Sequence, residues 1–263
     1  MTVGEALRLA EQRLGEAGVD TPRVDAELLL AHVLGVSRTG MHERRSQEAP
    51  DEFDDLLERR VRREPLAYVL GEWGFRRLVL HTDARALVPR PETEVVVERC
   101  LALLRDETEP RVLDLGTGTG AIALSIADER PDARVTAVDS APDAVALARE
   151  NAERLDLDIE VREGDLRAAA EGWDLVVSNP PYIQADEWES LQPEIRDWEP
   201  RDALVGEGLH EEIARLASTR LLVFEVGDGQ ADHVAGALAS LGYADIAITS
   251  DLAEEDRVVE GRR

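Results

Sequence analysis

The sequence predicts an α/β fold, a mostly parallel and doubly wound sheet, preceded by a small helical domain and a β-hairpin linker. Residues 1–65 repeat apolar side chains at helical spacing, and residues 66–91 are short extended pieces broken by glycine and proline. From residue 111 onward, strand patterns alternate with helical patterns, as in sheets whose parallel strands are joined by helices. We therefore predict three parts, at residues 1–65, 66–91 and 92–263.

Three amphipathic helices are expected in the first part. One covers Gly4–Ala17, and a third covers Asp51–Arg63. Between them, Thr21 is placed to cap a helix that Pro22 opens and Gly35 ends. A small bundle of this kind suits recognition of a substrate, and an equally good interpretation is a scaffold.

The linker is expected to form a β-hairpin, and a helix is expected to begin near Glu92. The remaining elements follow from the alternating pattern. Strands are predicted at 111–115, 134–139, 159–162, 174–178, 220–225, 244–249 and 257–261, and helices at 119–129, 141–155, 209–219 and 229–241. No helix separates the last two strands, so they should pair antiparallel at one edge of the sheet.

Composition narrows the class of protein. The chain has 263 residues and a net charge of −26, and all 30 of its basic residues are arginine. Such a surface repels phosphate backbones, although a GC-rich genome and a salty cytoplasm would also produce this composition. No apolar run is long enough to span a membrane, and the histidines show no metal-ligand spacing. The one cysteine, Cys100, lies in an apolar helical pattern and is expected to be buried. We expect a cytoplasmic monomer with no metal and no membrane or direct nucleic-acid partner.

The most informative motif is Asn179-Pro180-Pro181-Tyr182, which directly follows an apolar strand. The prolines fix the backbone and have no N–H group. The Asn179 side-chain carbonyl and the Pro180 main-chain carbonyl are two acceptors on a rigid frame beside an aromatic ring. This arrangement suits a flat NH2 group, such as a carboxamide or the exocyclic amine of a base.

A second motif predicts a cofactor site. Residues 112–121 form a strand, a glycine-rich turn and the start of a helix, and the glycines let a ligand lie against the backbone. Asp139 ends the next strand, where a carboxylate can accept hydrogen bonds from ribose hydroxyls. The pattern Gly116-x-Gly118-x-x-Ala121 also satisfies the dinucleotide fingerprint.

The glycine loop alone does not identify the cofactor, and the position of Asn179 decides between a dinucleotide and a methyl donor. Ligands of open α/β sheets bind at the carboxyl ends of the strands, so Asn179 should face the glycine loop across one crevice. Paired acceptors for an NH2 group serve an N-methyltransferase, whereas a hydride-transfer enzyme has no clear need for them.

Over nearly its whole length the chain resembles the bacterial release-factor glutamine methyltransferases (the HemK-type family). The resemblance rests on six stretches of sequence, two of which hold the motifs above. These are 65–71, 87–94, 114–120, 178–183, 196–201 and 256–259. The Asn-Pro-Pro-Tyr motif alone is shared with DNA adenine and ribosomal RNA guanine methyltransferases, so a nucleic-acid amino-methyltransferase is the alternative function.

The resemblance implies a class I methyltransferase fold, S-adenosylmethionine as methyl donor and S-adenosylhomocysteine as product. It implies a class 1 peptide chain release factor as substrate, methylated on the glutamine of its Gly-Gly-Gln loop. By matching positions, the expected cofactor contacts are Gly116, Thr117, Gly118, Thr119, Gly120, Asp139, Leu166 and Asn179. The expected substrate contacts are Asn179, Pro180, Pro181 and Tyr182, of which Asn179, Pro180 and Tyr182 would act in catalysis.

The sequence leaves the role of three further residues open. Arg90, Glu92 and Glu94 lie in a motif of the family, yet they would equally serve as an ion pair and as acidic residues at a helix N-terminus. Two segments depart from the family pattern: 204–209 looks shorter than usual, and 217–221 lacks a Pro-Gly-Gly turn. Both lie outside the matched site motifs, so they bear on the local fold more than on the chemistry.

Overall fold

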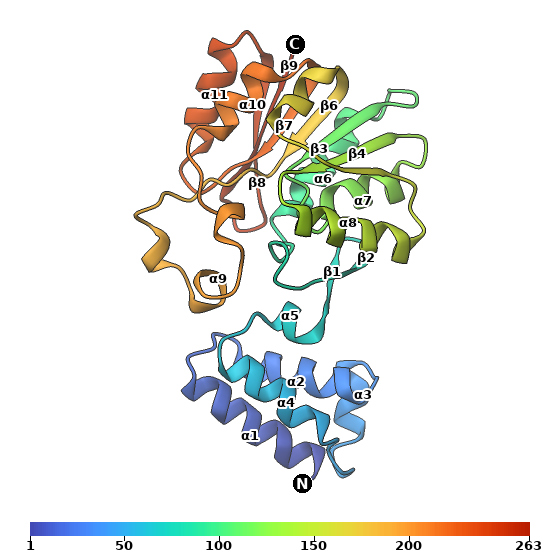
Figure 1. Cartoon of the computed structure of the whole chain (residues 1–263). Helices are drawn as coiled ribbons and strands as arrows, with labels where there is room; N and C mark the ends of the chain where they lie inside the picture. The colour runs from blue at the N-terminus through green and yellow to red at the C-terminus, as the bar shows by residue number, and fades with distance from the viewer. The chain divides into compact units, whose positions relative to one another are not determined.

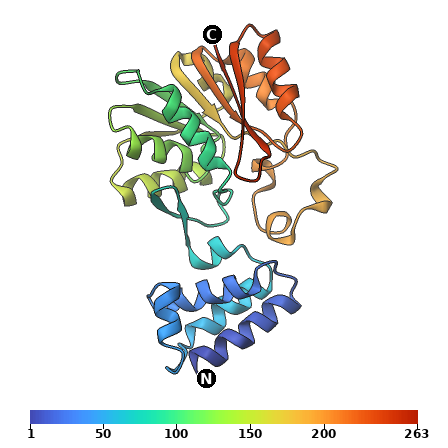
Figure 2. The same cartoon turned by 180° about the vertical axis from the view of Figure 1, so that it is seen from behind.

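The computed structural model describes all residues, 1–263, and its contacts divide the chain into two compact units (Figures 1 and 2). The first unit holds Met1–Glu72 together with Gln192–Trp198, and the second holds Trp73–Leu191 and Glu199–Arg263. The functional division into 1–65, 66–91 and 92–263 stays a prediction. No helix of the structure is both long enough and apolar enough to cross a lipid bilayer.

The first unit is helical, as predicted, but it has more helices than the three expected. They are α1 (Val3–Glu16), α2 (Pro22–Val33), α3 (Arg38–Glu43), α4 (Glu52–Val61), α5 (Leu66–Leu70) and, from the distant segment, α9 (Pro193–Arg196). Buried side chains at helical spacing, such as Leu7, Leu14, Leu30 and Phe53, form one core. Because these apolar stripes have no other surface to cover, their burial against one another holds the bundle together.

Two local expectations for this region were wrong, one of them only in part. Thr21 is the N-cap residue of α2 and Pro22 opens the helix, as predicted, but the Thr21 hydroxyl donates to the Asp25 carboxylate at 2.7 Å instead of capping the helix backbone. Residues 66–70 form α5, where we expected extended chain. Pro65 supplies the position before the first turn, where its missing N–H costs nothing, and Gly71 ends the helix with a φ of +73°.

The predicted hairpin is present as a separate two-stranded sheet. It pairs β1 (Glu72–Phe75) with β2 (Leu78–His81). The Asn151 side chain ties the end of β2 to the rest of the second unit, since its Oδ1 accepts from the His81 N–H at 2.7 Å and its Nδ2 donates to the Thr119 carbonyl at 2.9 Å. The hairpin is therefore fixed beside the glycine loop.

The second unit is built on a seven-stranded sheet of order β5-β4-β3-β6-β7-β9-β8. Its strands are β3 (Arg111–Leu115), β4 (Arg134–Asp139), β5 (Glu160–Glu163), β6 (Trp173–Ser178), β7 (Thr219–Glu225), β8 (Ala244–Ser250) and β9 (Asp256–Arg262). The first five strands in the order are parallel, and β9 runs antiparallel to both β7 and β8. The doubly wound sheet with antiparallel strands at one edge confirms the predicted fold class.

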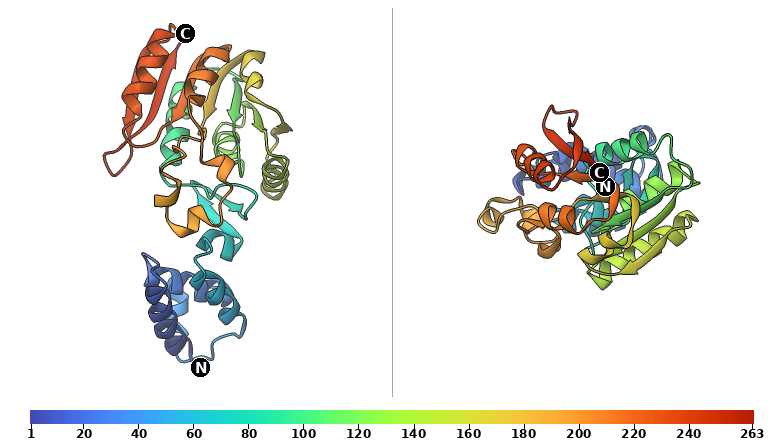
Figure 3. Two further views of the ribbon diagram at one scale, coloured as in Figure 1. Left: turned by 60° about the vertical axis from the view of Figure 1, so that its left-hand side comes forward. Right: turned by 90° about the horizontal axis from the view of Figure 1, so that it is seen from above.

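Helices cover both faces of this sheet. They are α6 (Thr93–Leu103), α7 (Ala121–Glu129), α8 (Pro142–Leu155), α10 (Leu209–Leu216) and α11 (Ala231–Ser240), with short 3₁₀ turns η1 (Leu166–Glu171), η2 (Trp188–Ser190) and η3 (Arg201–Ala203). Alternate strand residues face two cores, one with α6 and α7 and the other with α10 and α11. Figure 3 shows α11 alongside the β8–β9 ribbon. Helix α10 ends at Leu216, three residues before the predicted end, because β7 already begins at Thr219.

Candidate active site

The glycine loop joins β3 to α7 and turns at three glycines with positive φ, which are Gly116, Gly118 and Gly120. The first two have open space where a side chain would be: a Cβ on Gly116 would meet nothing nearer than the Asn179 carbonyl at 4.0 Å. A Cβ on Gly120 would come within 2.9 Å of Leu124. Gly116 and Gly118 therefore leave room for a ligand against the backbone, whereas Gly120 is required for helix packing.

Asp139 closes the loop from the end of β4. Its Oδ2 accepts from the Gly118 N–H and its Oδ1 from the Ala141 N–H, both at 2.9 Å. Since each carboxylate oxygen has two lone pairs, both keep an acceptor position beyond these bonds. The half-buried Asp139 thus both orders the loop and remains available to hydroxyl groups of a ligand.

Asp114 supports the same loop from below. This fully buried carboxyl group accepts from the Thr117 hydroxyl at 2.6 Å and from the Ala123 N–H at 3.1 Å, and its second oxygen, Oδ1, has no hydrogen-bond partner. Burial raises the pKa of Asp114 to about 7, against the hydrogen bonds from Thr117 and Ala123. Asp114 does not line the cavity described below, so it supports the loop from inside the protein.

A cavity of about 330 Å³ brings the two motifs together, in the size range of small-molecule sites. Asn179 and the glycine loop both line it, because they follow the neighbouring parallel strands β6 and β3. Of the residues predicted to contact cofactor or substrate, those that line it are Gly116, Thr117, Gly118, Thr119, Asp139, Asn179 and Pro181. The shared cavity is the arrangement expected at the carboxyl ends of parallel strands.

The other residues predicted to contact cofactor or substrate lie outside this cavity wall. Gly120 and the buried Pro180 are structural neighbours of the wall, and Leu166 packs at the start of η1 against the core beneath α10. Tyr182 lines a neighbouring cavity of about 270 Å³ together with Gly206 and Gln230. The contact of Leu166 with the cofactor and the contact of Tyr182 with the substrate stay predictions.

The charges at the cavity are predominantly negative. The carboxylates of Asp139, Asp143 and Asp202 line it. Two arginines line it as well, but both already have acidic partners. Arg85 is paired with Asp83 and Glu150, and Arg90 with Glu199. The lining therefore suits a cationic ligand better than the pyrophosphate of a dinucleotide.

Arg90 and Glu94 also have structural partners. The Arg90 guanidinium donates to Glu199 Oε1 at 2.5 Å, and the same buried carboxylate accepts from the Val88 N–H at 3.2 Å. Glu94 accepts from the Arg76 N–H in the hairpin connection at 2.9 Å. These contacts hold the 87–94 motif against the second unit, and Arg90 in addition lines the cavity.

The residues at the end of β7 and just after it were not predicted from the sequence to belong to the site. Glu225 ends this strand with 2% of its surface exposed, and its carboxyl group accepts from the Thr93 hydroxyl at 2.6 Å. Gln230 Nε2 donates to the Tyr182 carbonyl at 3.0 Å, and Gly227 lies against the Tyr182 ring. The only sequence signal was an acidic residue at the end of an apolar strand.

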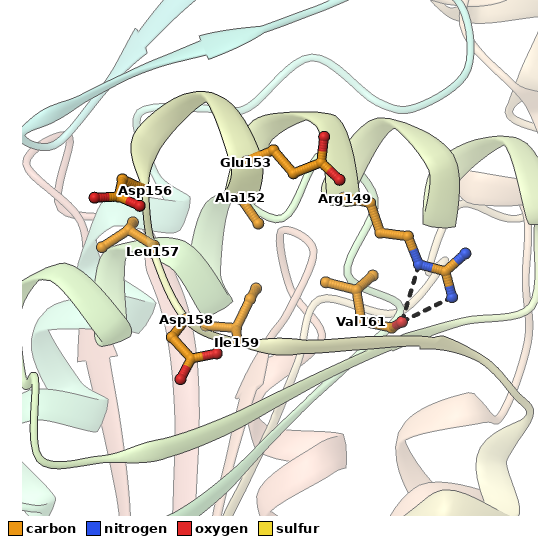
Figure 4. Close-up of a pocket in the computed structure, with 8 residues that line it drawn as sticks. All are labelled: Arg149, Ala152, Glu153, Asp156, Leu157, Asp158, Ile159 and Val161. Atoms are coloured by element: carbon orange, nitrogen blue, oxygen red, sulfur yellow. Dashed lines mark hydrogen bonds between the residues drawn. The ribbon is translucent and has the colours of Figure 1, made fainter.

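Another cavity lies between α8 and β5 (Figure 4). It has a volume of about 450 Å³ and an apolar floor that includes Ala152 and Ile159. Arg149 lies along its side and donates two hydrogen bonds to the Val161 carbonyl. None of the motif residues lines it, so it is not part of the candidate site.

Comparisons with solved structures agree with this fold. The catalytic domain of hMettl16 in complex with the MAT2A 3′UTR hairpin 6 is 16% identical, with a TM-score of 0.58 over 79% of this chain and 82% of that chain. A methyltransferase from Pyrococcus furiosus is likewise 16% identical, with a TM-score of 0.51 over 70% and 87% of the two chains. At this level of identity the likeness concerns the fold alone.

Comparisons of sequence are more specific. Residues 5–71 match the model of the PrmC N-terminal domain, and residues 95–193 match that of the methyltransferase small domain. Release factor glutamine methyltransferases from Cereibacter sphaeroides and Deinococcus radiodurans are 42% and 41% identical, each over 100% of this chain and 99% of the relative. The enzyme of that name from Escherichia coli is 39% identical over 92% of this chain and 93% of the relative. The chain is thus a member of the release factor glutamine methyltransferase family.

Proposed function

We propose that this protein transfers a methyl group from S-adenosylmethionine to the side-chain amide nitrogen of a glutamine in a class 1 peptide chain release factor. The target is the glutamine of the Gly-Gly-Gln loop. The observation that carries the proposal is the single cavity that Asn179 shares with the glycine loop. Near full-length relatives that bear the name release factor glutamine methyltransferase support the choice of substrate.

The cofactor fits the residues of the cavity. Asp139 is placed to accept from ribose hydroxyls, and the open side of Gly116 and Gly118 accommodates a ligand against the backbone. When bound, S-adenosylmethionine supplies a methyl group on a positively charged sulfur and becomes S-adenosylhomocysteine. The carboxylates of Asp139, Asp143 and Asp202 in the lining favour its positive charges.

The acceptor nitrogen needs orientation, because its lone pair is delocalised into the amide carbonyl. Asn179 Oδ1 and the Pro180 carbonyl accept its two N–H groups and stabilise the positive charge that develops as the nitrogen bonds to the methyl carbon. The nitrogen then loses one proton to solvent. Such positioning supplies several kcal/mol of a barrier, and one well-placed electrostatic partner is worth roughly 10²–10³ in rate.

Tyr182 is proposed to pack against the flat amide of the substrate. Burial, followed by the negative charge of Glu225, raises the pKa of its phenol to about 12. The phenol is therefore neutral at physiological pH and does not serve as a base. The helical first unit is proposed to recognise the body of the release factor.

Methyl transfer from labelled S-adenosylmethionine to a purified, unmethylated class 1 release factor tests the proposal. Peptide mass spectrometry should find one added methyl group on the Gly-Gly-Gln glutamine. Asn179→Ala should abolish transfer and leave cofactor affinity within about twofold of the parent. Unchanged transfer by this variant would refute the role of Asn179, and transfer to RNA or DNA in place of the release factor would favour the nucleic-acid enzyme.

A further inference from the structure

The buried end of β7 lies directly beside Asn179. In the sheet, Ser178 of β6 pairs with Phe224 of β7, so the next residues, Asn179 and Glu225, are neighbours across the strands. A hydrogen bond from the Asn179 side chain to the Glu225 carboxyl group favours the ionised form of that group. We propose that Glu225 is a positioning residue, which holds the NH2 end of the Asn179 side chain and so directs its carbonyl oxygen toward the substrate.

The chemistry of the two groups determines this orientation. An ionised carboxylate can only accept hydrogen bonds, so only the NH2 end of an amide can face it. The Thr93 hydroxyl donates to Glu225 Oε2, and the Asn179 NH2 group adds a second donor to the same carboxylate. A protonated Glu225 is also a donor and would be able to hold the Asn179 carbonyl oxygen instead, which would turn the acceptor away from the substrate. The inference therefore rests on the proposed function of Asn179.

The loop around Asn179 is fixed on its other sides. Before it, the Ser178 hydroxyl donates to the Leu115 carbonyl at 2.6 Å. After it, Gln230 holds the Tyr182 carbonyl, and a Cβ on Gly206 would come within 2.8 Å of the Pro181 carbonyl. With the backbone held in this way, the orientation of the Asn179 amide depends on the group behind its side chain, and that group is Glu225.

The protonation of Glu225 lies within the physiological range. Burial raises its pKa to about 7, against the Thr93 hydrogen bond, the charge of Arg257 and the Asn179 hydrogen bond, while the charge of Glu92 acts in the same direction as burial. The charge of Glu225 helps to raise the pKa of the Tyr182 phenol to about 12, so this group stays neutral over this range. From α10, His210 contacts the Glu225 main-chain carbonyl through Nε2 at 2.8 Å, and burial lowers the pKa of its imidazole. Raising the pH through about 7 therefore ionises Glu225 and orders the Asn179 amide.

The composition of the chain provides a direct measurement of this order. Asn151 and Asn179 are the only two asparagines, so a sample labelled with ¹⁵N in asparagine side chains gives two NH2 signals, and Asn179→Ala identifies one of them. We expect the Asn179 signals to titrate with an apparent pKa near 7. The titration should disappear in Glu225→Gln. Signals that do not change with pH, or that titrate equally in Glu225→Gln, would overturn the proposal.

Kinetics then tests the consequence for transfer. Glu225→Gln has nearly the same shape, but its amide can present either end to Asn179, so we expect kcat to fall at least 10-fold with less than twofold change in either KM. In the parent, kcat should rise with pH near 7 as Glu225 ionises, and this rise should be absent in Glu225→Gln. Glu260→Gln is the matched control, because Glu260 is another buried carboxylate of the same sheet, paired with Arg99 away from the cavity. This control should keep the parent kcat and pH profile.

The outcomes separate this inference from the proposed function. A normal kcat in Glu225→Gln, or an equal loss in Glu260→Gln, would overturn the positioning role. If the Asn179 signals titrate as expected but the parent protein methylates no release factor, Glu225 positions the amide and the proposed substrate is wrong.

Discussion

Gly227 lies in contact with the ring of Tyr182, and a Cβ at this glycine would come within 2.8 Å of Tyr182 Cδ2. The backbone of Gly227 is not in the left-handed region, so the close approach alone requires glycine. The chain at and just after the end of β7 thus supports two parts of the Asn-Pro-Pro-Tyr motif, the Tyr182 ring through Gly227 and the Asn179 amide through Glu225.

Gly227→Ala should therefore displace the Tyr182 ring. We expect kcat for methyl transfer to fall about 10-fold or more, since misplacement by about 1 Å can cost 10²-fold. Cofactor affinity, measured by calorimetry, should stay within twofold. Gly236→Ala is the control, because Gly236 lies within α11 with open space around it, and there alanine should add about 0.5–1 kcal/mol of stability. A Gly227→Ala enzyme with normal kcat would contradict the support of Tyr182 by this segment.

Asp139→Asn tests the cofactor end of the cavity. An asparagine has one acceptor oxygen where Asp139 has two, so either the Gly118 or the Ala141 N–H loses its partner. We expect S-adenosylmethionine to bind at least 10-fold more weakly, consistent with about 1–3 kcal/mol for an unsatisfied group. Calorimetric titration measures this directly, and equal affinities of variant and parent would exclude Asp139 from the cofactor site.

Local patterns were enough to predict the glycine loop, Asp139 and the Asn179 motif. Each of these follows directly after a strand with clear apolar periodicity, and the carboxyl ends of parallel strands meet at one edge of a sheet. Glu225 and Thr93 could not be found in this way. The contacts of Glu225 with Thr93 and with Asn179 depend on β7 lying next to β6 and on which face of the sheet α6 covers, and neither is encoded in a local stretch of sequence.

Long-range ion pairs were equally invisible in the sequence. Glu194 of α9 lies more than 130 residues after Arg60 and Arg63, yet it binds both side chains and joins the helical unit. A four-residue helix has no strong apolar pattern of its own, so its place in the fold is set by these contacts. By contrast, the burial of Cys100 followed correctly from its apolar neighbours.

Burial raises the pKa of the Cys100 thiol well above its usual range, and the thiol is fully buried. Because the thiolate is the reactive species, we expect a thiol-specific chromogenic reagent to leave the native protein unmodified at pH 8. The same reagent should react with one thiol per chain in denaturant. Rapid modification of the native protein would show that this part of the α6 core opens readily.

The pH dependence of stability should reveal the buried carboxyl group of Glu225. Its pKa is about 7 in the folded protein and 4.5 in an unfolded chain, so the folded state binds the proton more tightly. The free energy of unfolding therefore loses a contribution as pH rises from about 4.5 to 7, on the order of 3 kcal/mol. Glu225→Gln removes this loss, so relative to the parent it should gain stability between pH 4.5 and pH 8 in urea titrations. A constant difference across this range would contradict the raised pKa.

For Glu194→Gln, the difference in the free energy of unfolding from the parent should change with pH in the opposite direction. Burial acts to raise the pKa of Glu194, but hydrogen bonds from Arg63 and Arg60 outweigh it and hold the pKa below its usual value. Its stabilising contribution is thus complete above the unfolded value of 4.5 and is lost as pH falls through the lower folded value. At pH 7 the substitution leaves the buried Arg60 guanidinium with one acidic partner, Asp25, in place of two.

Breaking a buried pair of this kind typically costs about 3–5 kcal/mol. We therefore expect hydrogen exchange in α4 to accelerate in Glu194→Gln, and the difference in unfolding free energy from the parent to shrink toward acid pH. Glu109→Gln is the matched control, because its partner Arg134 is 71% exposed and such a surface pair contributes at most about 1 kcal/mol. Similar effects of the two substitutions on α4 would show that Glu194 does not hold the segment 192–198 to the helical unit.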